Sequence, residues 1–189
     1  MKNKKFKKKP EIKNRELINN EITINRLLKN SKIVTLYSTY EYNEYILLLM
    51  EYLNNNDLKH FIKTFHNKNP NSQFSEILCA YFMIQLLQAL FFLKMKNVLH
   101  RDIKPENIML SSKYIAKIGD FSLSRIIDNN AKFTTSRSGT LAYLAPECVK
   151  RRTPMSSKSC YKTDMFSLGV VMYFFLFNNH PFQYKLIFF

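Results

Sequence analysis

The feature that most constrains the fold of this chain is a long apolar run that ends in a cluster of polar residues. Residues 77–93 read ILCAYFMIQLLQALFFL, and the following segment at 97–110 reads NVLHRDIKPENIML. Six of the eight residues at 100–107 are polar or charged. Burial of an unpaired charge is costly, so such a cluster needs partners or a ligand. The pattern predicts a buried helix that leads into a functional loop.

Composition limits the classes of protein that this chain can belong to. A hydrophobic content of 46% with 14% aromatic residues excludes a disordered chain, and 189 residues suffice for one core or two small lobes. The net charge of +15 indicates an acidic partner, such as a nucleic acid, a membrane surface or a phosphate-bearing ligand. Much of this charge lies at 2–15, KNKKFKKKPEIKNR, which we interpret as a solvated basic segment. Neither aromatic interleaving nor zinc-ligand spacing supports nucleic-acid binding.

Cysteine usage and the apolar runs bear on the compartment. The three cysteines lack CxxC spacing, so we expect no disulfide framework and no cysteine metal site. We also find no signal peptide, and we expect a cytoplasmic or nuclear location. The apolar runs at 77–93 and 166–177 fall short of a membrane span of about 20 residues. We expect both to be buried helices of a soluble protein, with no transmembrane segment.

Periodicity predicts an α+β fold with a strand-rich end and a helical end. Helical spacing favours a helix at 17–28, and alternation favours two strands within 31–53, joined by a turn at 42–44. The remaining expected elements are a short helix at 54–66 with an Asn/Asp cap, a long helix at 75–96, a hairpin within 107–121, a polar loop at 124–140 and an apolar helix at 163–177.

The polar residues at 100–107, together with Asp120, are of types that suit phosphate and a divalent cation. Asp102 and Asn107 lie five residues apart with Lys104 between them, and Asp120 follows eighteen residues after Asp102 in KIGDFS. A proton acceptor, a cation and an amide oxygen at this spacing fit phosphate chemistry with a metal ion. Each of them alone could be an ordinary loop carboxylate or turn asparagine. Their combination and order indicate a site.

These motifs resemble those of the eukaryotic protein kinase family. HRDIKPEN at 100–107 resembles the catalytic loop of the family in its Ser/Thr form, of which Lys104 is typical. DFS at 120–122 stands where the family has DFG, and GTLAYLAPE at 139–147 is similar to the end of the activation segment. The likeness runs from about 17 to 182. TDMFSLGVVMY from 163 is similar to the buried helix that follows the activation segment in the family. LLLMEYLNNNDL at 47–58 is similar to the last strand of the small lobe and the hinge.

The resemblance implies a catalytic role for each residue of the loop. Asp102 would accept or orient the proton of a substrate hydroxyl, and Lys104 would stabilise the γ-phosphate in the transition state. Asn107 and Asp120 would hold Mg²⁺. The implied cofactors are ATP and Mg²⁺, and the implied partner is a protein substrate with a Ser or Thr acceptor.

It also implies a nucleotide site at the hinge. Met50 falls at the gatekeeper position, the backbone groups of Glu51 and Leu53 would meet the adenine edge, and Asp57 would bind the ribose hydroxyls. Glu21 would pair with a lysine on a neighbouring strand. An exposed helix glutamate is the alternative for Glu21, because its partner is not identified.

Regulatory residues follow from the same resemblance. Arg101 would pair with a phosphate on the activation segment. Ser136 is the preferred acceptor by its distance from Gly139, with Thr135 next. Thr140 resembles the threonine that contacts the catalytic loop in Ser/Thr kinases.

Several departures from the family weaken the expected nucleotide grip. The only glycines are at 119, 139 and 169, so no GxGxxG exists. The strand with V-A-I-K is absent or cut away. Lys2, Lys4 or Lys5 stand near the required distance from Glu21, but no apolar strand precedes them, and none is assigned.

Two further departures concern how the active state assembles. Ser122 replaces a glycine whose backbone freedom helps the segment switch. Asn25 stands where the family has an apolar contact, and it should weaken the active state by about 1–3 kcal/mol if it is unsatisfied.

The sequence predicts a partial small lobe at 1–50 and a partial large lobe at 51–189, truncated at its C-terminal end. Apolar surface around 166–177 would then be exposed and would need further helices or a partner. The preferred hypothesis is a fragment of a Ser/Thr protein kinase. The alternatives are a pseudokinase or kinase-like binding module, favoured by the missing glycines and lysine, and a basic nucleic-acid or membrane-surface protein, supported by charge alone.

Overall fold

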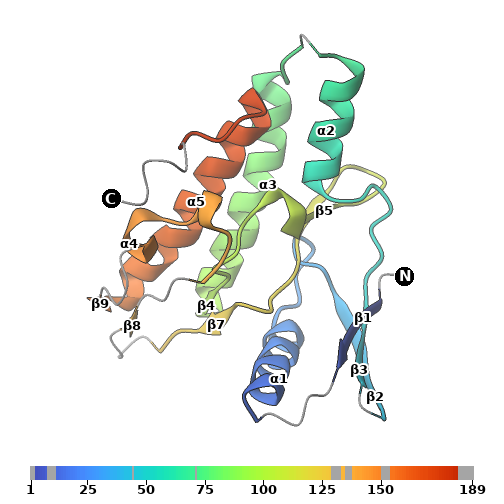
Figure 1. Cartoon of the computed structure of the whole chain (residues 1–189), viewed down its shortest axis with the longest axis vertical. Coiled ribbons are helices and arrows are strands. Elements are labelled where there is room, and N and C mark those ends of the chain that lie inside the picture. The colour runs from blue at the N-terminus through green and yellow to red at the C-terminus, as the bar shows by residue number, and fades with distance from the viewer. Residues whose placement is uncertain are drawn as a thin grey trace.

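The chain forms a strand-rich part and a helical part that meet at a central hairpin (Figure 1). This computed structural model describes residues 3–7, 12–43, 45–70, 72–128, 133–134, 138–149 and 154–182. The arrangement is the α+β fold expected from the sequence, with helices and a small antiparallel sheet.

The strand-rich part contains a three-stranded antiparallel sheet in the order β1-β3-β2. Its strands are β1 (Asn3–Lys7), β2 (Leu36–Tyr42) and β3 (Tyr45–Met50). Alternate residues of β3 are buried, so one face of the sheet meets a core while the other meets solvent. Helix α1 (Ile12–Leu27) adds Ile18 to this core, whose other buried members are Val34, Ile46, Leu48, Met50 and Leu53.

The helical part is built on α2 (Leu58–Lys68), α3 (Glu76–Met95) and α5 (Ser157–Phe177), which run side by side in Figure 1. The side chain of Asp57 caps α2 by accepting from the His60 N–H at 2.8 Å, and Ser75 caps α3 in the same way. Both caps fall where the sequence predicts helix starts. The packed faces of α3 and α5 supply fully buried residues to the main core, among them Phe82, Leu86, Leu93, Val171 and Phe175.

Short strand pairs connect these helices. They are β4 (Val98–Leu99) with β7 (Arg125–Ile126), β5 (Ile108–Leu110) with β6 (Ala116–Ile118), and β8 (Phe133–Thr134) with β9 (Pro154–Met155). A four-residue helix, α4 (Pro146–Val149), and two 3-10 turns (Pro105–Asn107 and Leu141–Tyr143) complete the described structure.

The β5–β6 hairpin joins the two parts of the molecule. On one side, the Ile118 N–H donates to the Lys32 carbonyl and the Val34 N–H donates to the Ile118 carbonyl, both at 2.9 Å. On the other side, the Leu110 N–H donates to the Asn56 carbonyl at 2.9 Å. The residues that follow β6 therefore emerge between the sheet and the helices.

Three expectations about the elements were wrong. A strand, β1, precedes α1, with Asn3 paired to Leu49 and Lys7 paired to Tyr45, where the sequence analysis found none. Its sequence NKKFK has a single apolar residue, so pairing with β3 outweighs local propensity. Helix α1 begins at Ile12 rather than at 17, and α5 begins at Ser157 rather than at 163. In α5 the capping side chain of Ser156 accepts from the Ser159 N–H at 3.2 Å.

The apolar helices are also longer than the apolar runs suggested. α3 spans 20 residues and the apolar part of α5 spans 19, so both have the length and hydropathy of a membrane span. The expectation that they are too short was therefore wrong. In this fold, 44% of the first and 50% of the second is buried inside the protein, and both supply residues to the main core.

Both helices also expose apolar side chains, as the sequence predicts for the region around 166–177. On α5 these are Met165, Met172, Tyr173 and Phe177. On α3 the most exposed are Ile77, Ile84, Phe91 and Met95, which are 57% to 84% exposed.

Candidate active site

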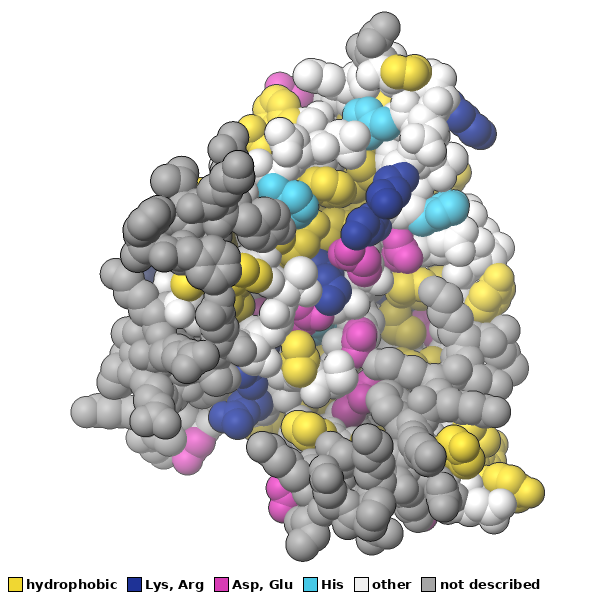
Figure 2. Space-filling view, viewed as in Figure 1, with side chains coloured by type: hydrophobic (Ala, Val, Ile, Leu, Met, Phe, Trp, Pro, Cys, Tyr) yellow, Lys and Arg dark blue, Asp and Glu magenta, His cyan; other side chains and the backbone are white. Residues whose placement is uncertain are grey.

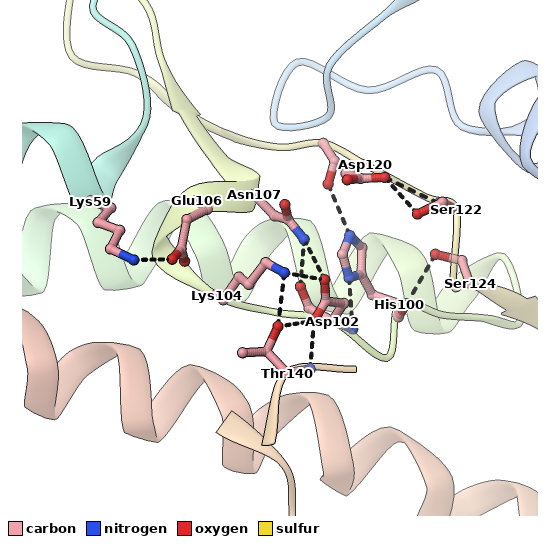
Figure 3. Close-up of polar contacts among 11 residues, drawn as sticks. Lys59, His100, Asp102, Lys104, Glu106, Asn107, Asp120, Ser122, Ser124 and Thr140 are labelled. Atoms are coloured by element: carbon pink, nitrogen blue, oxygen red, sulfur yellow. Dashed lines mark hydrogen bonds and ion pairs between the residues drawn. The ribbon is translucent and has the colours of Figure 1, made fainter. Parts of the chain in front are cut away.

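The polar loop at 100–107 lies between α3 and the β5–β6 hairpin (Figure 3). α3 ends at Met95, Asn97 turns the chain with a φ of 56°, and β4 is held by pairing with β7. The loop then closes with the 3-10 turn at 105–107, whose first residue is a proline that fits this position. The loop is thus fixed at both ends by backbone pairing. In the view of Figure 2, acidic and basic side chains gather in the middle of this face.

Asp164 anchors the start of the loop from α5. Its side chain is 4% exposed, and it accepts from the His100 N–H at 2.7 Å and from the Arg101 N–H at 2.9 Å. Burial raises the pKa of Asp164, while attraction to His100 and the two backbone hydrogen bonds oppose this shift. Arg101 has a φ of 71°, a conformation that these contacts hold in place.

His100 connects the loop to the segment after β6. Its ring is fully buried, and its Nδ1 accepts from the Asp102 N–H at 3.2 Å. Because Nδ1 accepts, Nε2 carries the proton and donates to the Gly119 carbonyl at 3.1 Å. The ring of Phe121 packs edge-on against it, with centroids 5.0 Å apart. His100 therefore sets the position of Asp102 on one side and of Gly119 on the other.

The carboxylate of Asp102 is the centre of a dense network (Figure 3). Its Oδ1 accepts from the Thr140 N–H and hydroxyl, both at 2.9 Å. Its Oδ2 accepts from Asn107 Nδ2 at 3.0 Å and pairs with Lys104 Nζ at 2.7 Å. Burial by itself would raise the pKa of Asp102, but the hydrogen bonds from Lys104 and Thr140 outweigh it, and the pKa is lowered. Asp102 is therefore held ionised and in one orientation.

Thr140 and Gly139 bring the activation segment onto this network. Lys104 Nζ donates to the Thr140 hydroxyl at 2.8 Å, so the lysine touches both Asp102 and Thr140. Gly139 has a φ of 108°, and a Cβ there would lie 2.4 Å from the Arg101 carbonyl oxygen. A glycine is required here because any side chain would push the segment away from the loop.

Asn107 and Asp120 lie on neighbouring segments next to Asp102. The Gly119 N–H donates to the Asn107 carbonyl at 2.9 Å, which places Asp120 beside the end of the loop. The Asn107 amide donates to the Asp102 carbonyl at 2.8 Å as well as to its carboxylate. This use of Nδ2 turns the amide oxygen away from Asp102. Asp120 itself has a φ of 62°.

These two side chains fit a magnesium ion. In the part of the chain that the structure describes, no group of three His, Cys, Asp or Glu side chains could hold a metal. Mg²⁺ is commonly held by one or two protein oxygens together with phosphate oxygens and waters. The carboxylate of Asp120 and the amide oxygen of Asn107 are hard oxygen donors of this kind. The donor set is therefore right for Mg²⁺ bound together with a nucleotide.

The residues predicted for the adenine edge lie at the end of β3. Met50 is buried in the small core, and Leu53 belongs to the same cluster. The Glu51 carboxylate accepts from the Thr35 N–H at 3.1 Å and pairs with Lys117 at 2.5 Å. The Glu51 N–H donates to the Thr35 carbonyl at 2.8 Å, so only the carbonyl of Glu51 is suited to meet adenine. The adenine roles of these residues stay predictions.

Asp57 and Glu21 are placed in other ways. Asp57 caps α2 through Oδ1, so its expected contact with ribose would add to a structural role. Glu21 lies on α1 with 2% of its side chain exposed, and the alternative of an exposed helix glutamate is therefore wrong. Of the lysines considered as its partner, Lys4 and Lys5 lie on β1 opposite Leu48 and Leu47, and Lys2 lies outside the described residues.

The regulatory residues are only partly described. Arg101 is half-buried, and its Nη1 donates to the Leu123 carbonyl at 3.4 Å. Burial and the nearby Arg125 guanidinium lower the pKa of Arg101. Thr135 and Ser136 lie outside the described residues. Thr140 lies in the network of Asp102, and a regulatory role for it stays a prediction.

Sequence reasoning missed four contacts at the site. It gave no role to His100 or Asp164, although both stand in matched motifs, because their bonds to backbone groups cross 19 and 64 positions of sequence. It also missed the ion pair between Lys59 of α2 and Glu106, which borders the loop (Figure 3). It treated Ser122 as a lost glycine, whereas its hydroxyl binds Asp120 at 2.7 Å.

Comparisons with known proteins agree with the motifs. The protein kinase domain family matches residues 1–186. The serine/threonine-protein kinase cds1 of Schizosaccharomyces pombe is 33% identical over 168 residues, which are 88% of this chain and 35% of that protein. An Aurora kinase of Eremothecium gossypii is 33% identical (86% of this chain, 41% of that protein). The human serine/threonine-protein kinase Nek5 is 32% identical (94% of this chain, 24% of that protein). The chain thus spans less than half the length of each of these relatives.

Proposed function

Because this chain belongs to the protein kinase family, we propose that it carries the phosphotransfer site of a serine/threonine protein kinase. The reaction moves the γ-phosphoryl group of ATP to a Ser or Thr hydroxyl of a protein. A bond forms between the hydroxyl oxygen and the γ-phosphorus, the bond from this phosphorus to the β-phosphate oxygen breaks, and ADP leaves. The network around Asp102 is the observation that carries the proposal.

Asp102 receives the proton of the attacking hydroxyl. Its lowered pKa keeps it ionised, as an acceptor must be, and four hydrogen-bond or ion-pair contacts fix its plane. A carboxylate has about four acceptor positions, so the substrate hydroxyl replaces one of the present donors. The Thr140 hydroxyl is the donor best suited to leave, because the Thr140 N–H keeps its own bond to Oδ1.

Lys104 and the Asn107–Asp120 pair serve the phosphate end of the reaction. Lys104 lies 2.7 Å from Asp102, so its charge is next to the oxygen that attacks, where it stabilises negative charge on the transferred group. Asn107 and Asp120 would hold Mg²⁺, which would supply positive charge to neutralise the charge that develops on the phosphates. This chemistry depends on positioning and electrostatics, which agrees with the fixed, hydrogen-bonded groups around Asp102.

The pseudokinase alternative has no structural observation in its favour. It was motivated by the absence of GxGxxG and of an assigned strand lysine. A strand, β1, precedes α1 and carries Lys4 and Lys5, but neither lysine is assigned as the partner of Glu21. The missing glycines remain, and we expect this chain in isolation to bind Mg·ATP weakly or not at all.

The test uses the full-length protein that contains this chain, with Ser/Thr peptides and labelled ATP. Asp102→Asn should lower kcat by about 10³-fold or more, because the proton acceptor is lost while the shape of the site is kept. Glu76→Gln, an exposed change at the far end of α3, is the control and should leave kcat unchanged. If the unchanged protein transfers no phosphate to any Ser/Thr peptide, the binding-module alternative replaces this proposal.

Partners and location are further proposals that rest on the same function. We propose protein substrates with Ser or Thr acceptors and a location in the cytoplasm or nucleus. All three cysteines are free and buried, which supports a reducing compartment. The exposed apolar side chains of α3 and α5 support a contact with a further folded segment or partner.

A further inference from the structure

Ser122 holds the carboxylate that faces the phosphate site. Its hydroxyl donates to Asp120 Oδ1 at 2.7 Å, and its N–H reaches the same oxygen at 3.4 Å (Figure 3). In the family that this chain resembles, a glycine stands here, so no hydroxyl is available. We propose that Ser122 is a positioning residue that orients Asp120 for Mg²⁺ and disfavours larger cations such as Ca²⁺. This inference rests on the proposed function.

The backbone on both sides of Asp120 is already fixed by hydrogen bonds. Ser122 therefore acts on the orientation of the Asp120 side chain. Before it, the Gly119 carbonyl accepts from His100 at 3.1 Å. After it, Phe121 is fully buried, and its carbonyl accepts from the Ser124 N–H at 3.1 Å. Asp120 is only half-buried, so packing alone does not select one side-chain rotamer. The hydrogen bond from the Ser122 hydroxyl favours one orientation of the carboxylate.

The conformation of Ser122 shows that no glycine is needed in this state. The described non-glycine residues with positive φ include Arg101 and Asp120 but not Ser122. A serine therefore fits the turn without backbone strain. It also removes the extra backbone freedom that a glycine would give, so the turn and the carboxylate are held by one residue.

The bond to Oδ1 has a direct consequence for cation choice. Ca²⁺ often takes both oxygens of a carboxylate, whereas Mg²⁺ demands octahedral geometry at short distances and takes few protein ligands. A hydroxyl proton on Oδ1 occupies one of the two acceptor positions of this oxygen, so coordination of a cation through both oxygens competes with the hydrogen bond. Coordination through one oxygen needs no such displacement. The serine should thus favour the smaller ion.

The test is equilibrium binding of a non-hydrolysable ATP analogue to the full-length protein, by calorimetry, with Mg²⁺, with Ca²⁺ and without a cation. Ser122→Ala should weaken Mg²⁺-supported binding about three- to tenfold, the scale of the net contribution of one typical hydrogen bond. Cation-free binding should not change. Because the loss should be larger with Mg²⁺ than with Ca²⁺, the ratio of Mg²⁺-supported to Ca²⁺-supported affinity should fall. Ser122→Thr keeps the hydroxyl and should restore the ratio, and Ser122→Gly should resemble the alanine variant.

Ser111→Ala is the matched control. The Ser111 hydroxyl oxygen accepts from the Ile115 N–H at 3.0 Å in the β5–β6 turn, away from the phosphate site. It should leave the cation ratio unchanged.

An unchanged ratio in Ser122→Ala would overturn the inference. So would an equal loss of affinity with and without cation, which would mean a general structural role. Absence of cation-supported binding in the unchanged protein would overturn it as well. If the unchanged protein binds the Mg²⁺ complex but transfers no phosphate to peptides, the proposed function fails while the cation preference can still be measured and stands.

Discussion

Two buried polar regions of this molecule are satisfied to very different degrees. In the polar loop, His100, Asp102 and Asn107 are at least nine-tenths buried, and each makes several short hydrogen bonds. On α1, Asn25 is equally buried, and its amide donates to the Glu21 carbonyl at 2.8 Å. Its Oδ1, however, has no hydrogen-bond partner among the described residues. Buried polar groups therefore stabilise one region and weaken the other. Whether such a group raises or lowers the free energy of unfolding depends on whether it has hydrogen-bond partners.

The structure meets the condition attached to the sequence prediction for Asn25. A polar residue was expected to weaken the active state if it is unsatisfied, and its Oδ1 has no hydrogen-bond partner among the described residues. The weakening itself stays a prediction. Around Asp102 the outcome is the opposite, since His100, Asp102 and Asn107 bond to one another and to the backbone. Within this loop, Glu106 Oε2 is the exception, because it has no hydrogen-bond partner among the described residues. The predictions below break the satisfied region or repair the unsatisfied one, from the largest effect to the smallest.

Asp164→Ala should break the satisfied region at its base. It leaves the N–H groups of His100 and Arg101 buried without their acceptor, so the free energy of unfolding should fall by about 2–5 kcal/mol. Urea denaturation followed by circular dichroism measures this change. Glu16→Ala, at an exposed position of α1, is the control and should stay within about 0.5 kcal/mol. Equal midpoints for the Asp164 variant and the unchanged protein would contradict the anchoring role.

Gly139→Ala should displace the activation segment from the loop. The new Cβ would meet the Arg101 carbonyl at 2.4 Å in a left-handed conformation, so we expect a loss of about 2–3 kcal/mol in stability. Gly169→Ala is the matched comparison, because its Cβ meets nothing within 4 Å on an exposed turn of α5. It should gain about 0.5–1 kcal/mol from helix propensity. Thermal unfolding of the two variants should therefore shift in opposite directions.

Asn25→Leu should repair the unsatisfied region. Removing the buried oxygen and filling the site with apolar atoms should raise the free energy of unfolding by about 1–3 kcal/mol. Asn19→Leu makes the same change at an exposed position of the same helix and should alter stability by no more than about 0.5 kcal/mol. Chemical denaturation of the pair separates the two cases. A destabilised Asn25 variant would show that the amide bond to Glu21 matters more than the orphaned oxygen.

Asp102 should contribute stability that depends on pH. Its folded-state pKa is lowered, so ionised Asp102 stabilises the fold above its unfolded pKa of about 3.9. This contribution is lost as pH falls through the lower folded-state value. The difference in unfolding free energy between the unchanged protein and Asp102→Asn should therefore shrink below about pH 4, with a slope of at most about 1.4 kcal/mol per pH unit. A difference that grows on acidification would contradict the lowered pKa.

Local signals in the sequence located most helices but not all of their limits. Asp57 and Ser75 cap α2 and α3 where Asn/Asp and Ser signals stand before apolar residues. The start of α5 was missed, because its first turns are polar and carry no apolar period to indicate a helix. Strand β1 was missed for a related reason, since its lysines would suit an exposed coil and only the pairing with β3 makes it a strand.

By itself, the sequence determined the family, the apolar helices and the residues that carry the expected chemistry. Motif order and apolar runs can be recognised in the sequence without any knowledge of tertiary contacts. The tertiary structure alone decided that Asp102 meets Thr140 and that His100 joins the loop to Gly119. It also decided that the oxygen of Asn25 has no partner in the described part of the chain. Whether a buried polar atom finds a partner depends on groups brought together from distant positions, and no local pattern encodes that meeting.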